Sequence, residues 1–168
     1  GAWIDFEMLQ DYAEGLIKFV IGRVLENNQE ELHILKRDKR KLETAISKQF
    51  VRMSYNDALN ELKNKAEMDV EWGKDLRTIE EDKLSMLYDT FIIVTRYPKS
   101  VKAFYMKEDP KDQRVVLGFD CIGPEGYGEI IGASEREPDL GKIRQRLIEQ
   151  GEDPRQYEFY LDTRRYGS

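Results

Sequence analysis

The segment "GFDCIGPEGYGEIIGASERE", residues 118–137, contains two short apolar runs joined by a glycine-rich turn. Within it, Gly123-Pro124-Glu125-Gly126 has proline at the second turn position and glycine at the fourth, as type I turns do. The segment therefore predicts an antiparallel hairpin. If Pro124 and Glu125 are the two loop residues, the strands pair so that Asp120 lies directly opposite Glu129.

Directly opposed carboxylates repel each other, so the pair Asp120 and Glu129 needs an explanation. Three arrangements would compensate: a shared proton, an arginine or lysine between the acids, or a bound cation. In the alternative, both carboxylates are exposed to solvent and the repulsion is tolerated. A shift of the turn by one residue would separate the two acids.

Glycines at 123, 126, 128 and 132 favour a binding site, because glycine-rich strands lose packing unless a ligand or a backbone approaches closely. ATP with Mg²⁺ is the ligand that fits, since Mg²⁺ uses one or two carboxylates together with phosphate oxygens. Asp120 and Glu129 are therefore candidate ATP-binding and metal-binding residues. Arg136 could hold a polar or anionic group. The sequence contains no GxxxxGK[ST] phosphate loop, and no dinucleotide-binding turn is expected at this segment.

The rest of the chain predicts an α+β fold, an antiparallel sheet flanked by helices, in one domain that spans residues 1–168. Residues 1–89 are expected to be mainly helical. Residues 90–136 contain four short apolar runs typical of consecutive antiparallel strands: "FIIVTRY", "VKAFYMK", "RVVLGFDCI" and "YGEIIGAS". Residues 137–168 return to helix, the last one beginning at Asp153-Pro154.

Apolar periodicity predicts which helix faces are buried. The first helix, capped by Asp5 and ending near Asn27-Asn28, should bury the residues spaced three and four apart: Phe6, Leu9, Ala13, Leu16, Val20 and Val24. A charged helix is expected over residues 30–47, and its run "KRDKRKLE" is interpreted as a solvated face, with an RNA contact as the alternative. After a short strand, Ser54 should cap a further helix. The helix that follows residue 77 should turn Ile79, Leu84 and Leu87 inward.

Composition excludes several classes of protein. The formal net charge of −6 argues against general binding to nucleic-acid backbones, and the single Cys121 excludes an internal disulfide framework. The apolar runs are too short to span a bilayer, so a soluble, cytoplasmic protein without a membrane partner is expected. Both ends of the sequence look cut, which suggests part of a larger protein.

Three stretches in order, "YPKSVKAFYMK", "GFDCIGPEGYGEIIGASERE" and "YLDTRRYGS", closely resemble the asparaginyl-tRNA synthetases. These are class II aminoacyl-tRNA synthetases of the subgroup shared with the aspartyl and lysyl enzymes. The opening "AWIDFEMLQDYAEGLI" resembles the segment after the family's second signature motif. The resemblance covers nearly the whole chain and implies an internal part of the class II catalytic core, without the anticodon-binding domain.

The resemblance implies a two-step ligase: ATP and asparagine form asparaginyl-adenylate, and the asparaginyl group passes to tRNA(Asn), with Mg²⁺ and normally in a homodimer. By the same resemblance, Asp120 and Glu129 hold Mg²⁺ and ATP, while Arg136, Gly132 and Tyr105 bind the amino acid. No residue acts as an acid or base, because the chemistry is mainly positioning and charge neutralisation. Tyr105 could instead be an ordinary core aromatic, and Lys102 is expected to be a solvent-exposed strand lysine.

The sequence departs from the family pattern where "GASERE" replaces "GGSQRE", so Glu135 adds a negative charge beside Arg136. The first two signature motifs are expected before residue 1 and the third after residue 168. The isolated chain should therefore be inactive. Three alternatives remain: a non-catalytic stand-alone module, an aspartyl-tRNA synthetase, or an asparagine synthetase relative.

Overall fold

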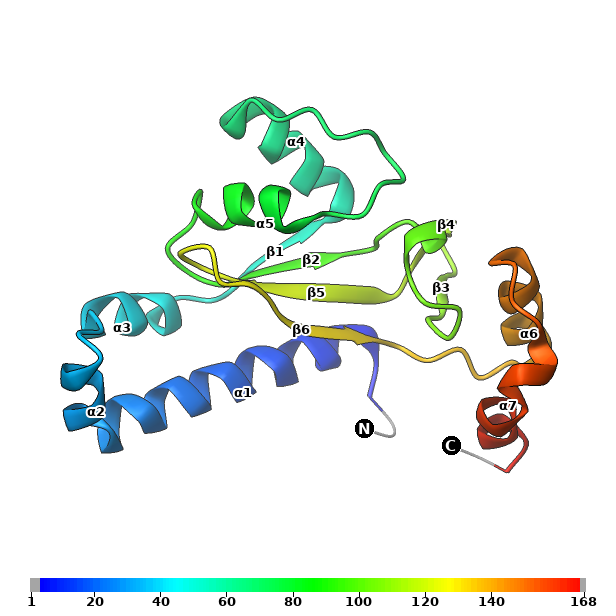
Figure 1. Ribbon diagram of the computed structural model, residues 1–168, viewed down its shortest axis with the longest axis horizontal. Coiled ribbons are helices and arrows are strands. Elements are labelled where there is room, and N and C mark those ends of the chain that lie inside the picture. The colour runs from blue at the N-terminus through cyan, green and yellow to red at the C-terminus, as the bar shows by residue number, and fades with distance from the viewer. Residues whose placement is uncertain (1–3, 167–168) are drawn as a thin grey trace.

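A four-stranded sheet separates two groups of helices in the computed structural model, which describes residues 4–166 (Figure 1). Its strands lie in the order β1 (Val51–Ser54), β2 (Ile92–Thr95), β5 (Gly118–Gly123) and β6 (Gly128–Ser134). The α+β class is confirmed. The sheet is mixed, however, because β1 pairs with β2 in parallel, and only the other two pairings are antiparallel.

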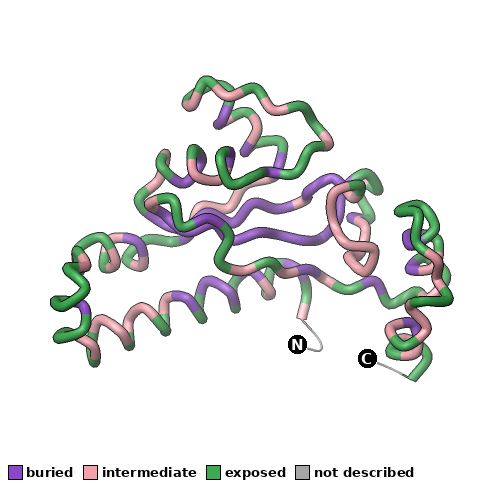
Figure 2. The backbone as a smooth tube through the Cα atoms, viewed as in Figure 1, coloured by how far each residue is buried: buried purple, intermediate pink, exposed green. Residues whose placement is uncertain are grey.

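Each face of this sheet is covered by different helices (Figure 1). Ile93, Phe119 and Cys121 face α1 (Phe6–Asn27), whereas Ile92 and Ile122 belong to the core under α4 (Tyr55–Ala66) and α5 (Thr78–Ser85). The central strands β2 and β5 are buried along their whole length, as Figure 2 shows. Burial on both faces explains why these two strands read as continuous apolar runs.

Helix α1 begins and ends as predicted, because the Asp5 carboxylate accepts a hydrogen bond from the Met8 amide at 2.8 Å and Asn28 caps the end. The predicted buried face is wrong in part: Leu16 is 57% exposed and Val20 48% exposed. The helix buries instead a set shifted around its axis, which includes two polar residues: Phe6, Gln10, Ala13, Glu14 and Ile17.

Glu14 explains the rotation of this face. Its carboxylate accepts a hydrogen bond from the Phe50 amide and pairs with Arg52 at 3.0 Å. These partners at the edge of the sheet compensate the charge of a residue that apolar periodicity alone places on the exposed face of the helix. The apolar side chains left on the outer surface of α1 line an open groove of about 510 Å³ with Asp11 and Gly15: Met8, Tyr12, Leu16 and Phe19.

The predicted helix over residues 30–47 is two helices, α2 (Gln29–Ile34) and α3 (Lys39–Ser47). The break contains Lys36 at a φ of 52°, and Asp38 caps the second helix. The break also turns part of the basic run toward the hairpin, where Arg37 and Lys41 contact Glu125. This part of the run is therefore not simply a solvated face.

The segment "VKAFYMK" is not a strand of the sheet, contrary to prediction. It follows a short 3-10 turn, η1 (Lys99–Val101), and residues 105–107 exchange backbone hydrogen bonds with residues 135–137 beyond the end of β6. A separate two-stranded sheet pairs β3 (Glu108–Asp109) with β4 (Asp112–Val116). In α5, Leu84 is fully buried as expected, but Ile79 is 57% exposed. Leu87, which follows the end of α5, packs partly against the core.

The chain ends in a small helical unit beside residues 99–107, visible at the right of Figure 1. It consists of α6 (Leu140–Glu149), η2 (Pro154–Tyr157) and α7 (Glu158–Arg165). Ile143, Leu147 and Leu161 form its core, and Phe104 packs against them. No helix within residues 4–166 has the length and apolar character needed to cross a membrane.

The tip of the β5–β6 hairpin differs from the predicted type I turn. Its central residues are Glu125 and Gly126, with φ values of 62° and 78°, and the Tyr127 amide donates to the Pro124 carbonyl. Two central residues with positive φ are typical of a type I′ turn, which matches the twist of paired strands. Glu125 tolerates this conformation because its carboxylate pairs with Arg37 and with Lys41.

The Glu125 contacts predict a stability that depends on pH. The Arg37 guanidinium, followed by Lys41, lowers the pKa of Glu125 to about 2. A lowered pKa stabilises the fold above the ordinary glutamate value, and this contribution is lost as the pH falls toward 2. Glu125→Gln should therefore reduce the free energy of unfolding by about 1 kcal/mol at pH 7, a value discounted for solvent screening.

Urea denaturation at pH 7 and at pH 2 measures this effect, and most of the difference between wild type and variant should be lost at the lower pH. Glu26→Gln is the control, since Glu26 pairs with Arg23 in a more exposed contact, in which the two side chains are 65% and 58% exposed. An equal loss of stability at both pH values would contradict the assignment.

Candidate functional site

The candidate site lies on one face of the β5–β6 hairpin, but the strand register differs from the predicted one. Asp120 lies opposite Gly132, and Glu129 lies opposite Ile122. The register shifts by one residue between Cys121 and Ile122. Such a bulge places two residues of one strand against one residue of the other.

The bulge is what brings the two acids to the same face. Side chains alternate along a strand, so the regular register of Asp120 with Gly132 would send Glu129 to the opposite face. After the shift, Glu129 shares the face of Ile122, which is also the face of Asp120. The pairing predicted from the sequence is wrong, whereas the predicted proximity of the two carboxylates is correct.

The distances from Gly132 to both carboxylates show how close the two acids are. The position that a Cβ atom would occupy on Gly132 lies 2.5 Å from Oε1 of Glu129 and 3.6 Å from Oδ1 of Asp120. The two carboxylate oxygens are therefore no farther apart than the sum of these distances. Glycine leaves this space free, and any other residue would push the Glu129 carboxylate away.

The electrostatics of this face are those of crowded acids. Partial desolvation of its carboxylate, and then the negative charge of Asp120, raise the pKa of Glu129. Burial also raises the pKa of Glu81 on α5, with further contributions from Glu129 and Asp120. Glu81 was not identified from the sequence, because no motif marks it and only the packing of α5 on the sheet brings it to the hairpin.

Lys102 compensates part of this negative charge, contrary to the prediction of an exposed lysine. Its side chain is 13% exposed, and Nζ lies 2.6 Å from Oδ2 of Asp120 and 3.3 Å from Oδ1 of Asp75. The ammonium group also lies 4.0 Å from the ring centroid of Tyr97. Although burial lowers the pKa of Lys102, attraction to Asp120 and Asp75 outweighs burial and raises it.

Arg136 and Tyr105 form a second group, beyond the end of β6. The Arg136 guanidinium lies 4.4 Å from the ring centroid of Tyr105 and donates a hydrogen bond to Ser134 Oγ at 2.6 Å. Glu135 points away and pairs with Lys107. Glu135, which departs from the family pattern, therefore does not place its carboxylate against the neighbouring Arg136.

The Arg136 side chain is exposed, and its stacking on Tyr105 is typical of a preorganised guanidinium that can bind a planar polar group. Tyr105 is only partly buried and also contacts Phe104 and Tyr160. It is thus both a member of the aromatic cluster and a wall beside Arg136.

Asp120 and Glu129 fit a magnesium ion that arrives with a nucleotide. Within residues 4–166, no group of three or more histidine, cysteine or acidic side chains is arranged to hold a metal ion by itself. Mg²⁺ needs only one or two carboxylates when phosphate oxygens and water complete its coordination. The elevated pKa of Glu129 also indicates an acid whose ionised form would be stabilised by a nearby cation.

Comparison with known proteins identifies the family. The family model described as tRNA synthetases class II (D, K and N) matches residues 1–168. The asparagine–tRNA ligase of Pyrococcus horikoshii is 45% identical over 168 residues, which are the whole of this chain and 38% of that protein. The corresponding enzyme of Desulforamulus reducens is 46% identical and is covered to 39%. The chain thus spans well under half the length of these relatives.

Solved structures agree with this similarity. The crystal structure of asparaginyl-tRNA synthetase from P. horikoshii complexed with asparaginyl-adenylate matches with a TM-score of 0.92 at 45% identity, over 100% of this chain and 38% of that one. An aspartyl-tRNA synthetase from Entamoeba histolytica matches with a TM-score of 0.84 at 27% identity, over 98% of this chain and 34% of the other. Because the family match spans the entire sequence, we conclude that this chain belongs to the class II tRNA synthetases of the D, K and N group.

Proposed function

We propose that the whole protein containing this chain is an asparagine–tRNA ligase. It activates asparagine with ATP to asparaginyl-adenylate and transfers the asparaginyl group to tRNA(Asn). The observation that carries the proposal is the pair of carboxylates, Asp120 and Glu129, gathered on one face of the β5–β6 hairpin next to a glycine that leaves their space open. The relatives named above support asparagine as the amino acid.

Asp120 and Glu129 are proposed to hold Mg²⁺ together with the phosphates of ATP. The ion would supply positive charge that offsets the phosphate charge met by the attacking carboxylate of the amino acid. The two residues differ in rigidity: Asp120 is buried on a central strand, whereas Glu129 is exposed on the edge strand. Asp120 therefore fixes the position of the site and Glu129 can adjust to the nucleotide.

Arg136 is proposed to bind the side chain of the amino acid, with Tyr105 and Gly132 lining the same pocket. Tyr105 restrains the guanidinium through stacking, and Ser134 accepts one of its hydrogen bonds. The remaining donors suit a carbonyl oxygen, which both asparagine and aspartate possess. Selection of the amide over the acid requires an additional acceptor, for which we expect a residue outside this chain.

Aspartyl specificity is the second candidate, favoured by one observation. Arg136 has no carboxylate contact from Glu135, which pairs with Lys107, and an unbalanced arginine prefers an acid to an amide. The whole protein is further proposed to act in the cytoplasm as a homodimer, and light scattering tests the dimer.

The first test is amino-acid-dependent exchange of pyrophosphate into ATP by the whole protein. We expect exchange with asparagine at least tenfold faster than with aspartate at equal concentration. Faster exchange with aspartate would replace the proposal with the second candidate. Residues 1–168 alone should give no exchange, because the resemblance places the family's three signature motifs outside them.

A second test removes one carboxylate. Glu129→Ala in the whole protein should reduce asparagine-dependent exchange at least a hundredfold, because one of two proposed metal contacts is lost. The fold should persist, since Glu129 is exposed on an edge strand. Glu152→Ala is the control, because Glu152 is an exposed residue between α6 and η2 whose carboxylate contacts Tyr157. Near-normal exchange by the Glu129 variant would exclude the metal role.

A third test fills the space beside the acids. Gly132→Ala places a methyl group 2.5 Å from the present position of Oε1 of Glu129, whose flexible carboxylate must then move. We expect a tenfold or greater rise in the KM for ATP, with an unchanged far-ultraviolet circular dichroism spectrum. Gly15→Ala is the matched control, because a Cβ atom at Gly15 meets nothing within 4 Å. An unchanged KM for ATP would show that binding of ATP does not depend on the position of the Glu129 carboxylate.

A further inference from the structure

Lys102 lies where a cation bound by the acidic face would lie. Its ammonium group is 2.6 Å from Asp120 and 3.3 Å from Asp75. Glu81 and Glu129 complete the set of acidic groups around the hairpin face, and the negative charges of Asp120 and Asp75 act on both. Lys102 thus provides positive charge to an acidic face formed by α5, two strands and the loop before α5.

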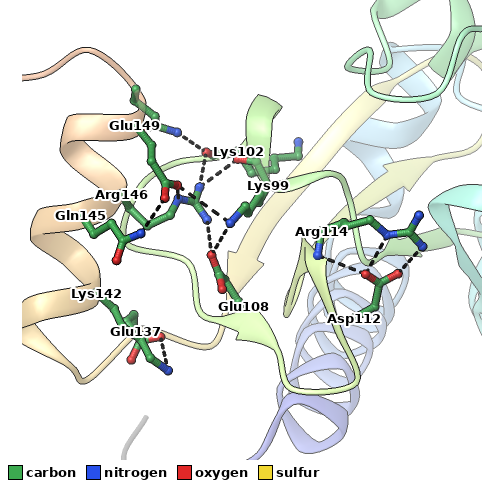
Figure 3. A network of polar contacts seen from close by, with 11 residues as sticks. Lys99, Lys102, Glu108, Asp112, Arg114, Glu137, Lys142, Gln145, Arg146 and Glu149 are labelled. Carbon is green, nitrogen blue, oxygen red and sulfur yellow. Dashed lines mark hydrogen bonds and ion pairs between the residues drawn. The ribbon is translucent and has the colours of Figure 1, made fainter.

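Helix α6 fixes the backbone from which Lys102 projects (Figure 3). Nη2 of Arg146 donates to the Lys99 carbonyl at 2.8 Å and to the Lys102 carbonyl at 3.4 Å, and Nε2 of Gln150 donates to the Lys102 carbonyl at 2.8 Å. Arg146 is 5% exposed, so its two bonds are largely shielded from water, whereas the Gln150 bond is exposed. Lys99 and Arg146 also share the carboxylate of Glu108, at 2.8 Å and 3.7 Å.

The aromatic ring of Tyr97 completes this restraint from the other side. It is fully buried, and its centroid lies 4.0 Å from Nζ of Lys102. A cation over the face of an aromatic ring is attracted by the ring electrons. The Lys102 ammonium is therefore held by its backbone, by a ring and by two carboxylates, whereas a freely solvated surface lysine has none of these restraints.

We propose that Lys102 is the resident counter-cation of this acidic face, held in place by Arg146 on α6 and by Gln150 at the C-cap of α6, and that it competes with a divalent ion for Asp120. A free divalent ion gains little at Asp120, because the lysine already neutralises that charge. An ion that arrives with a nucleotide brings phosphate oxygens and additional negative charge, so it can bind while Lys102 stays. This last step rests on the proposed function; the competition itself does not.

The test measures binding of Mn²⁺ alone to the whole protein, without nucleotide, amino acid or tRNA, by electron paramagnetic resonance of the free ion. Lys102→Met retains an unbranched side chain against Tyr97 and removes the charge. We expect Mn²⁺ to bind at least tenfold more tightly to this variant than to wild type. Lys102→Gln provides a second neutral variant if the first does not fold.

The matched control is Lys107→Met, which removes a lysine from an ion pair with another partly buried carboxylate, Glu135. Its Mn²⁺ affinity should stay within twofold of wild type. A change of threefold or less in both Lys102 variants would overturn the proposal, and so would the absence of measurable Mn²⁺ binding in all of these proteins. Because no substrate is present, the result is independent of whether the protein exchanges pyrophosphate with asparagine.

The role of Arg146 as a positioning residue has its own readout. Arg146→Met should tighten Mn²⁺ binding more than threefold, in the same direction as the Lys102 variants, because the lysine is less restrained. Arg146→Lys keeps a buried cationic donor and should remain within twofold of wild type. A purely structural role would lower the melting temperature of Arg146→Met without changing its Mn²⁺ affinity, and would exclude positioning of Lys102 by α6.

Discussion

The β-bulge between β5 and β6 is the constraint on which the candidate site depends. It shifts the register by one residue, so that Asp120 and Glu129 project from the same face of the sheet. Without it, one carboxylate would face α1 and the other α5, and no shared cation could contact both. Gly132 makes the arrangement possible, since the Glu129 carboxylate occupies the space of its missing side chain.

The acidic side chains on this face of the hairpin require positive charge nearby. Four acidic side chains, from the loop before α5, from α5 and from both strands of the hairpin, converge on a region that a single, largely buried lysine partly neutralises. The lysine is placed by hydrogen bonds from α6, whose residues lie more than 40 positions further along the chain. Asp120 is the buried member of this set, and a buried carboxylate is tolerable only when a cation or a cationic side chain is present.

The hairpin is also fixed at its tip, away from the acids. Arg37 and Lys41 pair with Glu125, and the Arg37 guanidinium lies over the ring of Tyr127. These contacts compensate the positive φ of Glu125, and they couple the break between α2 and α3 to the turn. Within residues 4–166 no further strand pairs with the outer side of the edge strand β6, so tip and bulge together define the position of Glu129.

The sequence by itself determined the α+β class, the N-caps of α1 and α4, and the family, because caps and motifs depend on residues that are close together in the chain. It also singled out Asp120 and Glu129 as candidates for one site. Only the tertiary structure decided the register at Glu129, the burial of Lys102, the recruitment of Glu81, and the rotation of α1 around Glu14. Each of these depends on partners distant in the chain: a bulge inserts one residue that no periodicity marks, and a charged side chain is buried only where another element supplies its counter-charge.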